Sequence, residues 1–339
     1  MSMTKSSRID DLRLIAKVSR LYHEHGLRQT QIVDRLGLSQ STISRLLKRA
    51  RQERIVRVSV VVPPGVHTEL EERLQSAYGL RDAVVVDVDE SETTSSHVLK
   101  YIGAAAAHYV EAILQRGEVV GVSSWSRALL AMMDSMPRMP HPTGARVVQM
   151  LGGIGDPSKD AHANALTRQF AQLVRGEPKY LPAPGVVRSS QSRSFFLQDP
   201  FVREAMALFP SISLALVGVG AVSENYRTSS SAVVFSPEEL ESTVARGVVG
   251  DLCLRFFDVE GTPKATPLDE SVLGISLDQL KSVRRCVAVA GGREKVAAIR
   301  GAMRGGWING LITDRLTAEA LIESAKPAWA AASASLTSS

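Results

Sequence analysis

Apolar side chains recur every three or four residues through the first fifty residues, in three runs separated by short polar breaks. This period is that of an α-helix with one buried face. The first run covers residues 10–22, the second 30–36 and the third 39–51. The start of the chain is therefore expected to be a small three-helix unit.

The break between the second and third runs has the spacing of a helix-turn-helix. Gly37 supplies a residue free to adopt positive φ at the sharp turn, and an aliphatic side chain follows it. Ile43 and Leu46 then anchor the third helix on the second. Thr30 and Ser39 are placed to cap these helices, because short hydroxyl side chains accept hydrogen bonds from unpaired backbone N–H groups.

The outward side of the third helix carries amide, hydroxyl and basic side chains, which are the types that contact DNA bases and phosphates. The residues expected to contact bases are Gln40, Ser41, Ser44 and Arg45, and those expected to hold the DNA backbone are Thr30, Gln31, Thr42, Lys48 and Arg49. An ordinary solvated helical hairpin is the alternative. Against it, residues 1–60 carry 13 Lys and Arg but 5 Asp and Glu, whereas the rest carries 27 and 30. A basic start on a slightly acidic body indicates an anionic partner for the start alone.

After the third helix, the stretch 54–63 alternates Arg and Val and is strand-like. It is either the wing of a winged helix-turn-helix or the strand that leaves that domain. Pro63, Pro64 and Gly65 then break the pattern. Two domains are expected: a DNA-binding domain over 1–62 and a second, larger domain over 63–339.

From residue 66 onward, short aliphatic strands alternate with amphipathic helices. The expected strands are 82–88, 118–123, 145–153, 211–220, 252–259, 285–292 and 310–314, and the expected helices are 68–79, 96–117, 126–136, 163–176, 294–306 and 317–325. Nearly continuous apolar strands between helices are typical of an α/β fold with a parallel sheet covered on both faces. In such folds ligands bind beyond the carboxyl ends of the strands.

The segments at these strand ends lack a complete enzymatic signature. The glycines of GVGAVS lack the third glycine of a dinucleotide loop, there is no GxxxxGK[ST] phosphate loop, and Ser123 is not on a nucleophile elbow. We find no compact set of His and carboxylates for acid–base catalysis. No cofactor and no metal are expected.

The strand-end segments suit binding instead. SSWSR follows a strand and opens a helix, so its backbone N–H groups and serine hydroxyls favour an anion or a hydroxyl-rich ligand. AGGREK repeats this arrangement with Lys295, and Asp251 is an acceptor for sugar hydroxyls. The candidate ligand residues drawn from the strand ends are Ser123, Ser124, Trp125, Ser126, Arg127, Gly152, Gly153, Asp251 and Lys295. Taken singly, each has an ordinary structural reading as a cap or a surface charge.

The remaining composition restricts the compartment. Cys253 and Cys286 each lie in an apolar run and are expected to be buried free thiols. The N-terminus lacks a signal-peptide core, and no apolar run approaches the roughly 18 residues that span a bilayer. A cytoplasmic protein without membrane contact is expected.

The chain resembles the SorC family of sugar-responsive bacterial transcriptional regulators. The resemblance rests on the N-terminal helix-turn-helix and on five further stretches that occur in the family's order: PAPGVV, NALTRQFAQLV, LVGVGA, GVVGDLCLRFFD and AVAGGREKVAAIRGAMRGGWINGLITD. It implies a winged helix-turn-helix joined to a Rossmann-like effector domain of the sugar-phosphate isomerase type, without its catalysis. It also implies a homo-oligomer, often a tetramer, that binds double-stranded operator DNA under control of a sugar, polyol or sugar phosphate.

By position, the resemblance assigns ligand hydroxyls to Asp251 and the phosphate or a hydroxyl to Lys295, with His162 and Asn164 lining the same cleft. The family's phosphate cradle is richer in Gly and Thr than SSWSRA, and Trp125 adds either a stacking face or a core side chain. Both a phosphorylated effector and a free sugar or polyol therefore stay open. There are two rival interpretations. In one, the protein is an isomerase or deaminase with a DNA-binding appendage, and in the other, the N-terminal unit binds protein instead of DNA.

Overall fold

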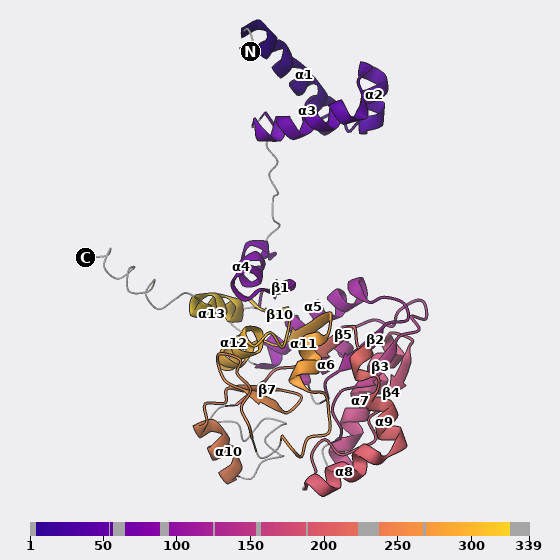
Figure 1. Cartoon of the computed structure of the whole chain (residues 1–339), viewed down its shortest axis with the longest axis vertical. Coiled ribbons are helices and arrows are strands. Elements are labelled where there is room, and N and C mark those ends of the chain that lie inside the picture. The colour runs from indigo at the N-terminus through magenta and orange to yellow at the C-terminus, as the bar shows by residue number, and fades with distance from the viewer. Residues whose placement is uncertain are drawn as a thin grey trace, which may run out of the picture. The chain divides into compact units, whose positions relative to one another are not determined.

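The computed structural model describes residues 5–53, 55–56, 65–88, 95–124, 126–153, 157–187, 189–222, 237–266 and 269–325. The chain divides into two compact units, the head Met1–Val62 and the body Pro63–Ser339 (Figure 1). Over the described ranges, no helix is both long enough and apolar enough to cross a membrane.

The head is built from the three expected helices. These are α1 (Lys5–His23), α2 (Gln29–Leu36) and α3 (Gln40–Gln52). Ile15, Ile32 and Ile43, one from each helix, have no exposed surface and form the centre of its core. Gly37 has a φ of 64° and closes α2, which confirms the sharp turn of the helix-turn-helix.

The caps of the head follow the expectation at one helix only. Ser39 precedes α3, and its side chain accepts a hydrogen bond from the backbone N–H of Thr42 at 3.2 Å. The prediction that Thr30 caps α2 is wrong: the cap is Arg28, so the helix begins one residue before Thr30. The side chain of Gln31 accepts a hydrogen bond from the Arg28 N–H at 2.8 Å, which stabilises this earlier start. The expected wing lies largely outside the described residues and stays a prediction.

The body contains a seven-stranded sheet of the expected parallel type. Its strands are β1 (Asp82–Val86), β2 (Val119–Val122), β3 (Arg146–Gln149), β4 (Glu177–Lys179), β5 (Leu214–Val217), β9 (Arg285–Val289) and β10 (Gly310–Asp314), and their order across the sheet is β1-β10-β9-β5-β2-β3-β4. Every pairing between neighbours is parallel.

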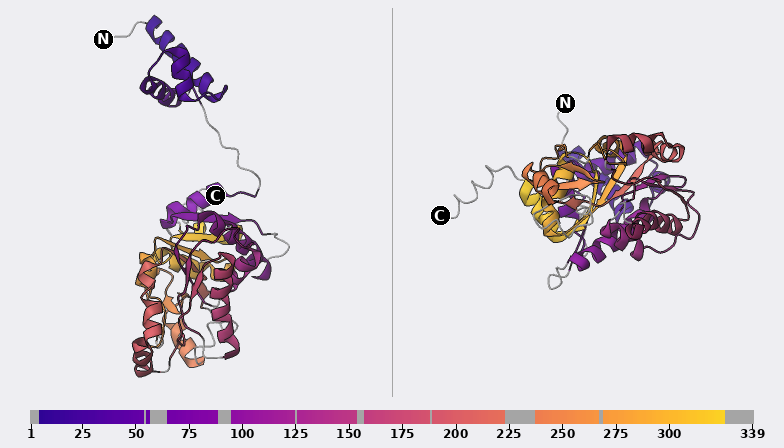
Figure 2. Two further views of the ribbon diagram at one scale, coloured as in Figure 1. Left: turned by 90° about the vertical axis from the view of Figure 1, so that its right-hand side faces the viewer. Right: turned by 90° about the horizontal axis from the view of Figure 1, so that it is seen from below.

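Helices lie on both faces of this sheet (Figure 2). They are α4 (Thr68–Tyr78), α5 (Ser95–Ile113), α6 (Arg127–Ser135), α7 (Pro157–Leu173), α8 (Ser190–Gln198), α9 (Pro200–Met206), α10 (Pro237–Ala245), α11 (Leu277–Ser282), α12 (Val296–Arg304) and α13 (Arg315–Ala325), with short 3-10 turns at Phe209–Ser211 and Arg293–Lys295. The α5, α6 and α7 helices pack together on one face, and α4 and α13 pack on the other beside β1 and β10.

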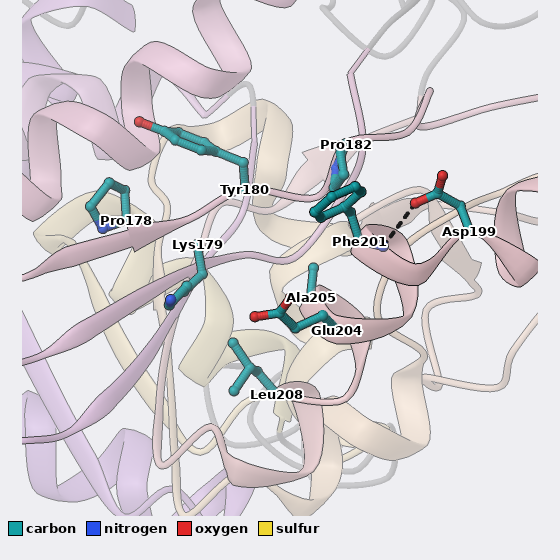
Figure 3. A pocket seen from close by; sticks show the side chains of 9 residues that line it. All are labelled: Pro178, Lys179, Tyr180, Pro182, Asp199, Phe201, Glu204, Ala205 and Leu208. Atoms are coloured by element: carbon teal, nitrogen blue, oxygen red, sulfur yellow. Dashed lines mark hydrogen bonds between the residues drawn. The ribbon is translucent and has the colours of Figure 1, made fainter.

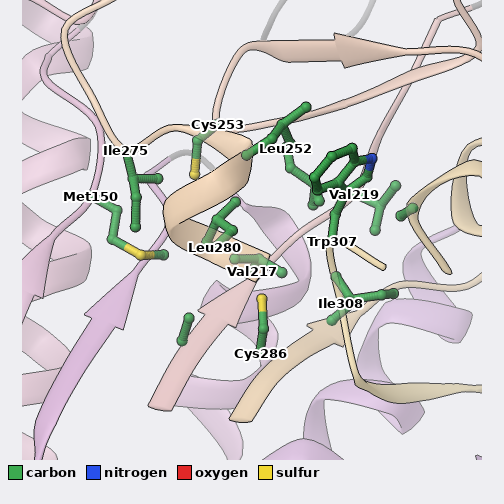
Figure 4. Close-up of a cluster of buried hydrophobic side chains, with 14 of the residues drawn as sticks. Met150, Val217, Val219, Leu252, Cys253, Ile275, Leu280, Cys286, Trp307 and Ile308 are labelled. Atoms are coloured by element: carbon green, nitrogen blue, oxygen red, sulfur yellow. The ribbon is translucent and has the colours of Figure 1, made fainter. Parts of the chain in front are cut away.

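Alternate residues of each strand divide the core into two layers. On β5, Leu214 and Leu216 join the layer beneath α5 and α6, whereas Ala215 and Val217 join the opposite layer. Figure 4 shows part of that second layer, in which Val217 and Cys286 point among the side chains of later elements. This two-sided burial explains why the strands are apolar without interruption.

One expected strand is wrong. The run 252–259 is expected in the parallel sheet, but it belongs to a separate antiparallel sheet formed by β6 (Gly220–Ala221), β7 (Gly250–Leu252) and β8 (Arg255–Phe257). The chain reverses at Cys253 and Leu254, whose φ values are 51° and 60°. Residues with positive φ are usually Gly, Asn or Asp, which is how a tight turn is recognised in a sequence. Because Cys253 and Leu254 are neither, the sequence does not indicate the reversal. Both cysteines are buried free thiols, as expected, and burial raises the pKa of each.

The strand order reverses between β2 and β5. From β2 the chain proceeds outward to β3 and β4, and from β5 it proceeds the other way through β9 and β10. In open parallel sheets such a reversal leaves a crevice beyond the carboxyl ends of the two central strands. Ser123 follows β2 and Gly218 follows β5, so a ligand is expected to bind near these two residues.

Candidate functional site

The segment Gly218–Gly220, which joins β5 to β6, is the point on which the candidate ligand residues converge. The Ser123 hydroxyl accepts a hydrogen bond from the Gly218 N–H at 3.1 Å. A Cβ at Gly218 would lie 2.3 Å from the Ser126 hydroxyl oxygen, so only a glycine allows α6 to begin this close to β5. The loops after both central strands are therefore joined through this segment.

Lys295 and Asp251 reach the same segment from the other side. The Lys295 ammonium donates to the Val219 carbonyl at 2.9 Å. Asp251 pairs with Gly220 between β7 and β6, and a Cβ on Gly220 would lie 2.0 Å from the Asp251 Oδ1. Its other carboxylate oxygen accepts from the Leu254 N–H at 3.1 Å, which fixes the side chain. One cation and one carboxylate therefore flank three consecutive residues.

The electrostatics of Lys295 bring in Arg127. Burial lowers the pKa of Lys295 below its ordinary value, and Arg127 lowers it further, whereas Glu294 and Asp251 act in the opposite direction. Arg127 is the first residue of α6 and is exposed. Arg127, Glu294 and Asp251 thus each act on Lys295, an arrangement suited to a ligand that carries hydroxyls together with an anionic or polar group.

The other candidate ligand residues at the strand ends make hydrogen bonds within the protein. Ser124 donates to the Leu151 carbonyl at 2.9 Å, and Ser126 caps α6 by accepting from the Leu129 N–H at 3.2 Å. The Gly152 and Gly153 N–H groups donate to carbonyls of Leu273 and Ala183 at 3.1 and 2.9 Å. These contacts hold the strand-end loops together, and the serine hydroxyls keep capacity for a second hydrogen bond.

Of the three remaining candidate ligand residues, only Asn164 has a described side chain. Asn164 is exposed on the second turn of α7. Trp125 and the side chain of His162 lie outside the described residues. The sequence analysis does not name residues Gly218–Gly220 as part of the binding site, although their glycines are a signal that side chains approach them closely.

The DNA-facing candidates lie on the head as the helix-turn-helix requires. Gln40, Ser44, Arg45 and Lys48 are exposed along α3, opposite the buried Ile43 and Leu46. The hydroxyls of Ser41 and Thr42 lie 2.9 and 2.8 Å from the Ser39 hydroxyl, and Thr30 and Gln31 are exposed on α2. The guanidinium of Arg49 instead donates to Asp11 and Glu53, each at 2.9 Å. Arg49 therefore connects α1 to α3.

Family models match both units of the chain. Residues 63–323 match the family described as "Putative sugar-binding domain", and residues 10–58 match a homeodomain-like domain. The sorbitol operon regulator of Klebsiella pneumoniae is 32% identical over 93% of this chain and 99% of that protein. The deoxyribonucleoside regulator of Bacillus subtilis is 30% identical over 91% of this chain and 97% of that protein.

Solved structures agree with this comparison. The crystal structure of the full-length sorbitol operon regulator from Klebsiella pneumoniae matches 92% of this chain and 99% of its own, with a TM-score of 0.71. A helix-turn-helix joined to a parallel-sheet sugar-binding domain defines a class, the transcriptional regulators whose DNA binding is controlled by a sugar effector. The chain belongs to the SorC family of these regulators.

Proposed function

We propose that this regulator controls genes of carbohydrate or polyol catabolism, and that its effector binds at the β2–β5 reversal. The observation that carries the proposal is the convergence of Ser123, Lys295 and Asp251 on Gly218–Gly220. Arg127 and Lys295 would hold an anionic or polar end of the effector, and Asp251 would accept from its hydroxyls. A free sugar, a polyol and a sugar phosphate all fit this chemistry.

We assign the bases of the operator to Gln40, Ser41, Ser44 and Arg45. Thr30, Gln31, Thr42 and Lys48 would hold the DNA backbone. Arg49 is reassigned from the DNA backbone to the packing of the head, because its guanidinium already pairs with Asp11 and Glu53. A dimer or higher homo-oligomer follows from this function, since paired heads read two half-sites.

We also propose that the body does not catalyse a reaction. Among the described residues at the β2–β5 reversal, Asp251 is the carboxylate found against Gly218–Gly220, and its two oxygens face a backbone N–H and the glycine backbone. An isomerase or deaminase needs a paired acid and base within reach of one substrate. Turnover of a sugar phosphate by the purified protein would favour the enzyme interpretation instead.

A thermal-shift screen against polyols, free sugars and their phosphates tests the site. Binding to the folded state raises the melting temperature by mass action. The Asp251→Asn variant keeps the side chain's size but loses its charge, and we expect it to weaken effector binding at least tenfold. Asp278→Asn, an exposed position on α11, is the matched control and should bind as the parent does. Equal binding by both variants would remove Asp251 from the site.

The effector that produces the shift decides between the two chemistries. A selective shift with a free polyol or sugar would mean that the serine-rich loop after β2 holds hydroxyls. A shift only with the phosphorylated form would mean that the loop and its cations hold phosphate, although SSWSRA has few glycines.

A further inference from the structure

A second feature of the body lies at the outer edge of the sheet, away from Gly218–Gly220. A cavity of about 380 Å³ opens between the segment that follows β4 and the helix α9 (Figure 3). Its walls include Tyr180, Pro182, Phe201 and Glu204, which we call the β4–α9 surface. The effector residues described above are not part of this surface.

This surface exposes apolar side chains to an unusual degree. The Phe201 ring is 70% exposed and Tyr180 is 37% exposed, and Phe195 on the adjoining helix α8 is 73% exposed. The two phenylalanines are the most exposed large apolar side chains among the described residues. Exposed aromatic side chains on neighbouring elements are typical of interaction surfaces. A small-molecule site buries most of its ligand, whereas the rings here stand in water.

The composition of the surrounding surface favours a protein partner. Between residues 189 and 201, every exposed side chain is Ser, Gln, Pro or Phe, and the charged walls of the cavity are one cation, Lys179, and two carboxylates, Asp199 and Glu204. Protein interfaces are depleted of charge at their centre and enriched in aromatic residues. A nucleic acid would instead require basic side chains.

The partner does not add a strand to the sheet edge. The β4 strand is three residues long and contains Pro178, which has no N–H to donate. Lys179 and Glu177 form an ion pair across it at 2.6 Å. The side chains of the β4–α9 surface, rather than the backbone of β4, are therefore available for docking.

The charges next to Phe201 are self-complementary. Arg203 and Glu204 are exposed, adjacent and opposite in sign, and neither belongs to an ion pair found among the described residues. A twofold contact brings each residue of a patch to a different residue of the same patch on the other subunit. Arg203 of one copy would then meet Glu204 of the second copy.

We propose that the β4–α9 surface is a contact between two copies of this chain. The aromatic rings form its centre, and the Arg203–Glu204 pairs form its charged margin. The choice of a second copy rests on the proposed function, because an operator with two half-sites requires paired heads.

Sedimentation velocity of the full chain, without DNA or effector, tests the proposal. Phe201→Glu should weaken self-association at least tenfold and yield a smaller species, and its exposed position leaves folding unchanged, as circular dichroism would verify. Tyr101→Glu, at a 40% exposed position on α5, is the matched control and should sediment as the parent does. A parent chain that is monomeric at all concentrations would overturn the proposal, as would a Phe201→Glu variant that assembles like the parent.

A charge exchange adds a sharper test. Arg203→Glu and Glu204→Arg should each weaken the assembly, and the double variant should restore it, because the two pairs are then re-formed with their signs exchanged. If the double variant is as weak as the single ones, the twofold pairing is wrong. The effector-induced thermal shift of Phe201→Glu separates the two proposals. A retained shift leaves the effector site intact, whereas an abolished shift with unchanged assembly assigns the cavity to the effector.

Discussion

Arg45 and Arg49 lie one turn apart on α3 but differ in what holds them. Arg49 pairs with Asp11 on α1 and with Glu53, and these carboxylates raise its pKa. Arg45 is exposed on the face that carries Gln40 and Ser44. An exposed guanidinium on this face is available for two parallel hydrogen bonds to a guanine. The two arginines therefore have separable roles.

We predict that Arg45→Ala weakens binding to the operator by about 1–3 kcal/mol and relaxes the base preference at one position, because alanine cannot make the two hydrogen bonds to the base. Binding to random DNA should change far less. Lys48→Ala is the control: without this ammonium beside a phosphate, operator and random DNA should both bind more weakly and with a smaller salt dependence. Fluorescence anisotropy at several salt concentrations measures all of these. An equal weakening on both DNAs for Arg45→Ala would make Arg45 a backbone contact.

At the scale of single residues, the sequence predicts which residues belong to the candidate site better than it predicts which of them contact one another. Ser123, Asp251 and Lys295 are each identified from their places at strand ends, where the fold rule applies. The meeting of Asp251 with Gly220 depends on β6 and β7 pairing across about 30 residues, which no local pattern encodes. The cap at Thr30 fails because Gln31, rather than a hydroxyl, accepts the first backbone N–H.

The amino ends of the central strands are tied together by one buried carboxylate. Glu118, just before β2, accepts from the Ser213 hydroxyl at 2.7 Å and from the Arg285 guanidinium at 2.6 and 2.7 Å. Arg285 also donates to the Ile113 carbonyl at 2.8 Å. Three neighbouring strands are thereby fixed at the end opposite to the effector site. Burial alone would raise the pKa of Glu118, but the hydrogen bonds from Ser213 and Arg285 lower it below its ordinary value.

We predict that Glu118→Gln destabilises the protein by about 3–5 kcal/mol, because it leaves Arg285 buried without its anion. Glu260→Gln is the control: Glu260 pairs with Arg300 and Arg304 at the surface, and its replacement should cost under about 1 kcal/mol. Urea unfolding measures both. Equal destabilisation would mean that burial adds nothing to the Glu118 cluster.

The pH dependence of the same cluster has a definite sign. The folded pKa of Glu118 is lower than its unfolded value of about 4.3, so the unfolded chain binds more protons. The contribution of Glu118 is complete above about pH 5 and is lost as the pH falls through the unfolded value toward the folded one. The difference in unfolding free energy between the parent and Glu118→Gln should shrink over that range.

At the scale of elements, continuous aliphatic runs predict the strands because both faces of the sheet are buried. The β4 strand is not predicted, since three residues that include Pro178 resemble a loop. The helices α8 and α9 are also missed, because they bury few side chains and so lack a clear apolar period. The strand β4 and the helix α9 form the β4–α9 surface, where apolar side chains face outward, and α8 adjoins it. The helices α10 and α11 are not predicted either.

At the scale of the whole body, hydrogen bonds connect the loop of Lys295 with the segment that leads to the head. The Gly292 N–H lies 3.0 Å from the Asp314 carboxylate and 2.8 Å from the Thr317 hydroxyl, so the loop is held at the end of β10. The next residue, Arg315, donates to Asp87 at 3.2 Å. Asp87 in turn pairs with His67 at 2.8 Å, four residues after Pro63 begins the body. Three consecutive contacts, Gly292–Asp314, Arg315–Asp87 and Asp87–His67, therefore connect the Lys295 loop with the first residues of the body.

We predict that Asp87→Asn leaves the affinities for effector alone and for operator alone within about twofold of the parent, but reduces their mutual effect by about 0.5–2 kcal/mol. Glu319→Gln is the control, because it removes another carboxylate partner of Arg315 while leaving the contact between Asp87 and His67. Operator titrations with and without saturating effector, and effector titrations with and without operator, measure the coupling twice, and thermodynamic linkage requires the two values to agree. If Asp87→Asn couples as strongly as the parent, the signal reaches the head by another route, and the subunit contact at the β4–α9 surface becomes the next one to test.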